Sequence, residues 1–158
     1  MSFVITGLSP HHFSHLFGLP DAVLRALNVI RVTADQKPGY PCRITLEDAE
    51  PGESVLLLNH ESHAVATPFA SRYAIYVRES ARETATFTDE LAPVLRNREI
   101  ALRLFNAAGM LVGADMGRNE QLRIRIEAAL RLPEVAYIHA HNAMPGCFAA
   151  TIRRASHD

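Results

Sequence analysis

The sequence has no tryptophan, two cysteines and almost no net charge, and each scarcity excludes a class of protein. Cys42 and Cys147 are too few for a secreted disulfide scaffold or a four-cysteine zinc site. The 16 Lys and Arg residues are balanced by 17 Asp and Glu residues, so no binding of nucleic acid is expected. The longest aliphatic run, Val55 to Leu58, is far shorter than the ~20 apolar residues of a membrane span, so no membrane partner is expected either.

What remains is the composition of an ordinary folded protein. A chain of 158 residues that is 48% hydrophobic can bury one substantial core, which predicts a single domain over residues 1–158. Met1 to Pro10 lack the charged and apolar regions of a signal peptide, and this predicts a cytoplasmic protein with reduced thiols. One bridge between Cys42 and Cys147 stays open as an alternative.

The hydrophobic periodicity predicts an α+β fold, with about seven strands in a mainly antiparallel or mixed sheet and about four short helices. The expected strands include 43–47, 55–58, 73–78 and the hairpins 99–115 and 135–154. The expected helices are 10–18, 21–27, 89–96 and 119–132. The segment 99–115 also fits a helix, but its alternation favours the hairpin.

The C-terminal hairpin allows a prediction of strand register. Its two strands are separated by the turn signal Met144-Pro145-Gly146, and each strand carries apolar residues at even positions. Placing both apolar sets on one face pairs even positions with even ones. Cys147 should then lie on the same face as His139 and His141.

A His-x-His pair on a strand places two imidazoles on one face, about 6.5 Å apart at the backbone, where they can chelate one metal. We therefore predict a divalent metal such as zinc at His139 and His141, with His63 as a third ligand. Cys147, His60, Glu61 and Cys42 are further candidates to complete the site. The plain alternative is that these histidines make ordinary hydrogen bonds at a sheet surface.

Four side chains are candidates for catalysis or ligand binding because of their chemistry. Cys147 is a candidate nucleophile with His139 or His141 as its base, and Glu61 is a candidate acid or base. Arg43 follows a rigid Tyr-Pro turn and could hold a ligand carboxylate or phosphate, or form a structural ion pair. Asn142 could bind a ligand or stabilise the turn through its amide.

Several separated motifs in this order resemble the bacterial family of proteins of unknown function numbered 1203. These motifs are Tyr40-Pro-Cys-Arg43, Asp48-Ala-Glu-Pro-Gly-Glu53, Val55-Leu-Leu-Leu58, Ala74-Ile-Tyr-Val-Arg-Glu79, His139-Ala-His-Asn142 and Gly146-Cys147. The resemblance spans about Phe3 to Ala155 and implies a single-domain bacterial protein, without an activity or a catalytic residue. Such members are expected to carry a Tyr-Glu-His-like segment where this chain has His60-Glu61-Ser62-His63.

The sequence thus favours a small-molecule or metal pocket around His139, His141 and Cys147, with metal-assisted or other hydrolysis as its reaction. The first alternative is a non-catalytic binding or interaction protein, a homodimer, with structural histidines. The second is a thiol redox site formed by Cys42 and Cys147.

Overall fold

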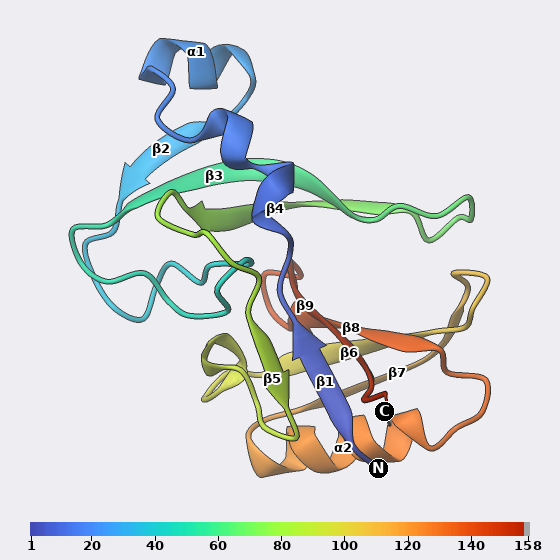
Figure 1. Ribbon diagram of the computed structural model, residues 1–158. Helices are drawn as coiled ribbons and strands as arrows, with labels where there is room; N and C mark the ends of the chain where they lie inside the picture. Colours follow the sequence, from blue (N-terminus) through green and yellow to red (C-terminus); the bar gives the residue numbers. More distant parts are fainter. Residues whose placement is uncertain (157–158) are drawn as a thin grey trace.

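The fold was analysed in a computed structural model that describes residues 1–156. It contains nine strands, two α-helices and three short 3₁₀ turns (Figure 1). The strands are β1 (Phe3–Thr6), β2 (Ile30–Thr33), β3 (Ser54–His63), β4 (Ser71–Arg78), β5 (Thr86–Thr88), β6 (Ile100–Phe105), β7 (Leu111–Gly117), β8 (Tyr137–Asn142) and β9 (Phe148–Arg154). The helices are α1 (Asp21–Ala26) and α2 (Glu120–Leu130), and the 3₁₀ turns are η1 (Pro10–His12), η2 (Ser14–Leu16) and η3 (Pro93–Leu95).

The strands form two antiparallel sheets, where the sequence analysis expected about seven strands in one sheet. The larger sheet has six strands in the order β5-β1-β9-β8-β6-β7, and the smaller has three in the order β2-β3-β4. Figure 1 shows the small sheet beside α1 at one end of the molecule and the large sheet beside α2 at the other. The predicted α+β class is therefore correct in outline. Because there are two sheets, a functional site can lie in the space between them.

Each sheet has its own hydrophobic core. In the large sheet, Leu102 and Ile138 pack with Leu122 and Ile126 of α2, and all four side chains are fully buried. The sequence spacing of Leu122, Ile126, Ala129 and Leu130 predicts one apolar stripe on this helix, and these are its buried residues. In the small sheet, Leu56 and its neighbours pack against η1, η2 and α1. The other face of the small sheet turns toward the large sheet.

The expected helices are shorter than predicted. Residues 10–18 form two 3₁₀ turns, although Ser9 accepts the predicted capping bond from the His11 N–H at 3.3 Å. Residues 89–96 contain only η3, because the Asp89 carboxylate accepts the backbone N–H of Phe3 instead of capping a helix. No helix within residues 1–156 is long and apolar enough to cross a membrane.

The segment 43–47 is a turn, so the strand predicted there is wrong. Leu46 has a positive φ of 55°, and its N–H donates to the Cys42 carbonyl at 3.0 Å. This left-handed conformation ends an extended backbone. The apolar residues that suggested alternation are buried in different cores: Ile44 packs with the small sheet and Leu46 with the large one.

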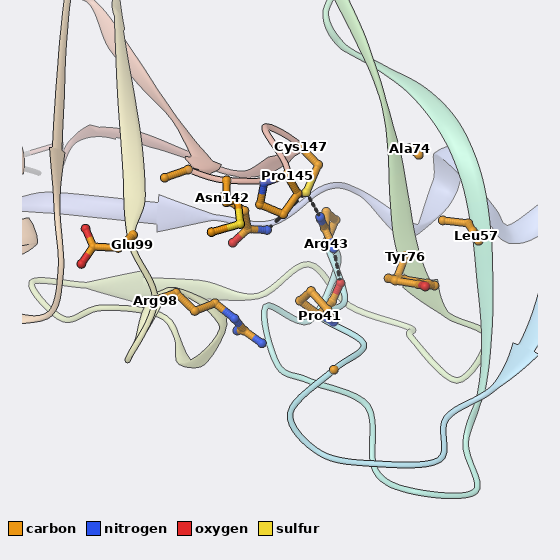
Figure 2. Close-up of a pocket in the computed structure, with 13 residues that line it drawn as sticks. Pro41, Arg43, Leu57, Ala74, Tyr76, Arg98, Glu99, Asn142, Pro145 and Cys147 are labelled. Atoms are coloured by element: carbon orange, nitrogen blue, oxygen red, sulfur yellow. Dashed lines mark hydrogen bonds between the residues drawn. The ribbon is translucent and has the colours of Figure 1, made fainter.

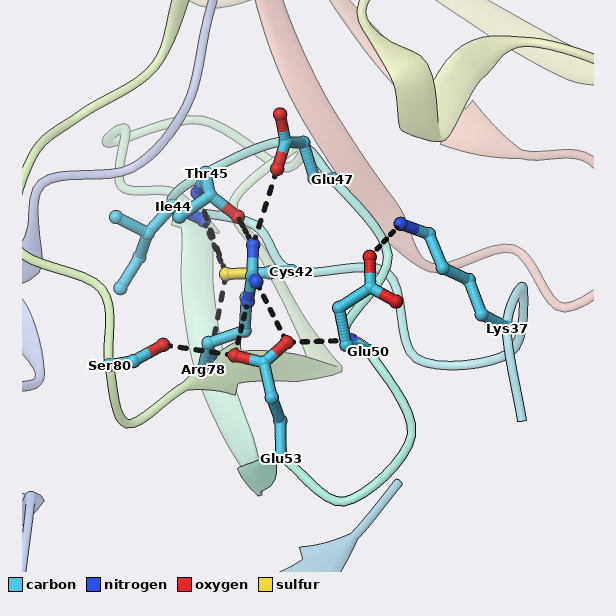
Figure 3. Close-up of polar contacts among 9 residues, drawn as sticks. All are labelled: Lys37, Cys42, Ile44, Thr45, Glu47, Glu50, Glu53, Arg78 and Ser80. Carbon is cyan, nitrogen blue, oxygen red and sulfur yellow. Dashed lines mark hydrogen bonds and ion pairs between the residues drawn. The ribbon is translucent and has the colours of Figure 1, made fainter. Parts of the chain in front are cut away.

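The long connection between β2 and β3 is held by the polar network shown in Figure 3. Arg78 of β4 donates to Glu53 at 2.7 Å and contacts Glu47 at 3.4 Å. The hydrogen bond from Arg78 lowers the pKa of Glu53, as expected for a carboxylate stabilised by a cation. Lys37 makes an additional ion pair with Glu50. The network fixes this connection, which carries Arg43, against the end of β4.

A β-bulge changes the outcome of the predicted C-terminal register. Ile138 pairs with Ile152 and Ala140 with Ala150, which confirms the even-with-even pairing in the middle of the hairpin. The register then shifts, so that His141 lies opposite Phe148. The extra residue in β9 reverses the faces beyond it. Phe148, and not Cys147, therefore packs against the two histidines, and the predicted face of Cys147 is wrong.

Candidate functional site

A pocket of about 520 Å³ lies between the two sheets (Figure 2). One wall is the open face of β3 and β4 and presents Leu57, Ala74 and Tyr76. The opposite wall is the β8–β9 turn, and the connection after β2 and the start of β6 close the remaining sides. The lining residues are Gly39, Pro41, Arg43, Leu57, Ala74, Tyr76, Arg98, Glu99, Asn142, Ala143, Met144, Pro145 and Cys147.

Arg43 is the most deeply buried charged group of this pocket. Its side chain is 2% exposed, and it donates to the Phe148 carbonyl at 2.8 Å and to the Pro41 carbonyl at 2.6 Å. Within residues 1–156 it forms no ion pair with a carboxylate. Burial lowers the pKa of Arg43, and the nearby sulfur atoms of Cys147 and Cys42 oppose that effect.

The Cys147 thiol is the acceptor of a further bond from Arg43. The Arg43 Nη2 group donates to Cys147 Sγ at 3.1 Å, and the Asn142 Nδ2 group donates to the same sulfur at 3.3 Å. Cys147 is partly exposed and lines the pocket. Three residues named by the sequence analysis therefore meet here, and Figure 2 shows Arg43 and Asn142 joined to Cys147 by these two hydrogen bonds.

Arg98 and Asp48 position the loops around this end. Asp48 is 6% exposed and accepts two hydrogen bonds from the Arg98 guanidinium, at 2.8 and 3.1 Å. Arg98 also donates to the Val94 carbonyl at 2.7 Å, and Asp48 accepts the Gly39 N–H at 3.2 Å. This bidentate pair joins the connection after β2 to the start of β6. The charge of Arg98 is neutralised by Asp48, whereas Arg43 has no such carboxylate partner in the described part of the chain.

The second cysteine, Cys42, is in a different environment. It is fully buried in the core of the small sheet, and its sulfur accepts the backbone N–H groups of Ile44, Thr45 and Arg78 at 3.3–3.5 Å. Both cysteines are free thiols in the structure. Pairing of Cys42 with Cys147 under oxidation stays a prediction.

The predicted histidines form a separate cluster between the sheets. The His63 and His139 rings lie 5.0 Å apart between centroids, and His141 lies 6.5 Å from His139. His63 comes from the end of β3, inside the strand and not after it. Aromatic rings surround the cluster, among them Phe105 and Phe148 at 5.4 and 5.0 Å from His139.

Hydrogen bonds define the state of two of these rings. His63 Nδ1 lies 2.7 Å from the Phe69 carbonyl and must donate to it, and Nε2 is hydrogen-bonded to the Tyr137 hydroxyl at 2.6 Å. His141 Nδ1 donates in the same way to the Gly146 carbonyl at 2.9 Å. Among the described residues, His139 has no hydrogen-bond partner, although it is only 5% exposed.

Burial keeps His139 and His141 neutral. Desolvation, together with the neighbouring His63 and His141 rings, lowers the pKa of His139 to about 3. Desolvation also lowers the pKa of His141 to about 4, although the bond to the Gly146 carbonyl opposes this change.

The arrangement does not present a ready set of metal ligands. Both His63 nitrogens are occupied by hydrogen bonds, which leaves free nitrogens only on His139 and His141. Zinc needs three or four protein ligands. No group of three or more His, Cys, Asp or Glu residues within 1–156 is arranged to hold a metal ion. The predicted metal at these histidines stays a prediction, and no chemistry is derived from it below.

Glu61 lies apart from both the pocket and the histidine cluster. It is exposed on β3, pairs across the strands with Arg72, and has its carboxylate 3.6 Å from the Arg72 guanidinium. It does not line the pocket. The role of acid or base predicted for Glu61 therefore has no contact with Cys147 to support it.

Sequence reasoning missed the apolar wall and the second arginine of the pocket. The unbroken apolar run 55–58 predicts a strand buried on both faces, yet Leu57 is only partly buried because it faces the pocket. Ala74 and Tyr76 share the face of β4 opposite Ile75, which packs in the core. Alternation along β4 marks that face, but only the stacking of two sheets shows that it lines a pocket. No pattern in the sequence indicates the Arg98–Asp48 pair.

The fold and the site define an α+β protein with a ligand-sized pocket between two antiparallel sheets. Comparison with protein families then places the chain: it belongs to the family "Protein of unknown function (DUF1203)", whose model matches residues 39–154. The matched region includes Arg43, Asn142 and Cys147, and the resemblance drawn from the sequence is confirmed. No curated protein and no solved structure matches the chain.

Proposed function

We propose that the protein binds a small organic molecule in the pocket between the sheets. The observation that carries this proposal is the combination of size and lining: about 520 Å³, an apolar wall, and a few convergent polar groups. Small-molecule sites in proteins are of this volume and this composition. Among the functions considered from the sequence, a small-molecule pocket around Cys147 has the most support.

The lining suggests how a ligand is oriented. Leu57, Ala74 and Tyr76 form a continuous apolar surface on which the hydrophobic part of a ligand can pack. Across the pocket, Arg43 and Asn142 supply N–H donors at the end where the Cys147 thiol lies. The ligand is therefore expected to carry an acceptor or an anionic group at that end and an apolar body at the other.

The Cys147 thiol is the candidate nucleophile for hydrolysis at this pocket, which the Glu99 carboxylate also lines. Within residues 1–156 the lining contains no histidine, because the bulge directs the histidines away from Cys147. Metal-assisted hydrolysis through His63, His139 and His141 has no support from the lining. Non-catalytic binding at the same pocket is the second candidate function. A measurement of ligand binding supports both candidates equally, and the reactivity of the Cys147 thiol distinguishes them.

The test is binding of anilinonaphthalene sulfonate, a fluorescent probe with an apolar body and an anionic group. The wild-type protein is expected to bind one equivalent saturably. Ala74→Trp fills the apolar wall from an exposed position, so it should weaken binding about tenfold or more, which corresponds to about 1.4 kcal/mol. Ala114→Trp, at an exposed position of β7 in the other sheet, is the matched control and should bind like the wild type.

Equal affinity of the Ala74→Trp variant and the wild type for the probe would contradict the proposal. Near-ultraviolet circular dichroism of both variants checks that tertiary packing is retained, because the probe also binds loosely packed proteins. Displacement of the probe by benzoate but not by benzamide would further show that the ligand end at Arg43 is anionic.

A further inference from the structure

We propose that Cys147 is a nucleophilic thiolate, with Arg43 as its counter-ion, and that it forms a covalent bond to an electrophilic carbon of the pocket ligand. The identity of the electrophile rests on the proposed function. The thiolate itself rests on the contacts of Cys147 alone and can be tested separately.

The first argument is the buried charge of Arg43. A guanidinium remains protonated in proteins, and a buried charge without a partner is costly. Arg43 is 2% exposed and, within residues 1–156, has no carboxylate in an ion pair. Its only hydrogen-bonded side-chain partner is the sulfur of Cys147. An anionic sulfur would neutralise this charge.

The second argument is the number of donors at the sulfur. Arg43 Nη2 and Asn142 Nδ2 both donate to Cys147 Sγ, at 3.1 and 3.3 Å. Neither group can accept the S–H of a neutral thiol, because a guanidinium and an amide NH₂ are donors only. Hydrogen bonds to the charged form of a group favour that form. Both contacts therefore stabilise the thiolate.

The third argument is access. Cys147 is partly exposed and lines the pocket, so a molecule bound there can reach the sulfur. Reactive cysteines in proteins lie in electropositive, partly exposed surroundings of this kind, whereas buried structural cysteines are inert. Cys42, fully buried in the core, is the structural cysteine of the same chain.

The chemistry that fits is attack on an activated acyl carbon. The sulfur forms an S–C bond with the carbonyl carbon, the C–O bond to the leaving oxygen breaks, and that oxygen departs with the electron pair. No base has to remove a proton, since the thiolate carries none, which fits a pocket lining without histidine. The donors of Arg43 and Asn142 are released as the sulfur loses its charge and can stabilise the negative oxygen of the intermediate.

The thiolate is tested by alkylation with iodoacetamide, a small neutral reagent that needs no binding site, with both cysteines followed by mass spectrometry. Cys147 in the folded protein should react about tenfold or more faster than Cys147 in the urea-unfolded chain, although folding alone slows access. Cys42 in the folded protein should not react. A folded rate at or below the unfolded rate would overturn the proposal.

Asn142→Asp provides a variant that keeps the size of the side chain and replaces a donor with a negative charge. The alkylation rate of Cys147 should fall on the order of tenfold, because the like charge disfavours the thiolate. An unchanged rate would contradict the argument from donors. Arg43→Met should lower the rate further, and Asn142→Asp keeps the test informative if Arg43→Met fails to fold. Ala114→Trp is the control with an unchanged rate.

The covalent step is tested with p-nitrophenyl acetate. The wild type should release p-nitrophenolate in a burst of about one equivalent and carry an acetyl group on Cys147, and Cys147→Ser should show neither. Fast alkylation without saturable binding of the fluorescent probe would support the thiolate and refute the proposed pocket ligand. Saturable probe binding with slow alkylation would support the pocket and refute the thiolate.

Discussion

The C-terminal hairpin carries two polar clusters that differ in almost every physical respect. The histidine cluster (His63, His139 and His141) lies between the sheets among aromatic rings, and burial keeps His139 and His141 neutral. The thiol cluster (Arg43, Asn142 and Cys147) lies at the pocket and contains a buried cation that has no carboxylate partner among residues 1–156. The residue types of the sequence indicated the histidines as the functional site. The uncompensated charge of Arg43 and the access of Cys147 to the pocket favour the thiol cluster instead.

The difference shows that burial can remove the catalytic and metal-binding capacity of a residue type that is often functional. An imidazole becomes an acid, a base or a metal ligand when its nitrogens are available and its pKa is near neutrality. Both nitrogens of His63 are hydrogen-bonded, so neither is available to a ligand. Desolvation lowers the pKa of His139 far below its ordinary value. The histidine cluster therefore has the properties of a structural interface between the two sheets. Its burial is expected to reduce the stability of the fold at acidic pH.

The largest expected effect is a loss of stability in acid. The pKa values of about 3 for His139 and about 4 for His141 lie below the ~6.5 of an unfolded histidine. Below pH ~6.5 the unfolded state therefore binds more protons than the folded state. The free energy of unfolding is highest above pH ~6.5 and falls as the pH decreases toward these pKa values. At about pH 5 each histidine should cost roughly 2 kcal/mol. Urea denaturation across this pH range measures the loss.

His139→Phe sharpens this prediction, because it replaces the titrating ring with an aromatic ring of similar shape. The variant should lose about half of the acid destabilisation at about pH 5, or roughly 2 kcal/mol. An acid profile identical to that of the wild type would show that His139 is not protonated on unfolding in the way its burial implies.

The next effect compares two histidines within the cluster. His63→Phe leaves the buried Tyr137 hydroxyl without its partner and removes one of the two donors to the Phe69 carbonyl, which keeps the hydrogen bond from Ser71. It should destabilise the protein by about 2 kcal/mol near neutral pH. His139→Phe breaks no hydrogen bond within the described part of the chain and should change the stability by less than about 1 kcal/mol. Chemical denaturation of both variants at neutral pH makes the comparison, and equal losses would contradict it.

The same contrast shows what the sequence could reveal. Alternation and helical spacing predicted the hairpin of β6 and β7, the strand β4 and the buried stripe of α2, since these depend on local periodicity. Arg43, Asn142 and Cys147 were singled out by residue type and lie together. Their contact was not predicted, because residues 104 positions apart in the chain meet only through tertiary packing.

One residue explains why the site was predicted on the wrong face. The bulge shifts the partner of His141 to Phe148, and a shift of a single residue exchanges the two faces of a strand. Nothing in the apolar pattern of the strand marks the unpaired residue. The pocket wall was missed for a similar reason, since the stacking of two sheets is a tertiary property that periodicity does not specify.

The two cysteines are expected to differ in their effect on stability. Cys42→Ala removes a fully buried sulfur and the acceptor of three backbone N–H groups, so it should cost about 1–2 kcal/mol. Cys147→Ala leaves the buried Arg43 guanidinium without the anionic partner proposed for it, so it should cost more, about 3 kcal/mol. Urea denaturation under reducing conditions compares the two variants. An equal or smaller loss for Cys147→Ala would mean that Arg43 does not depend on an anionic sulfur, and the argument from its buried charge would then fail.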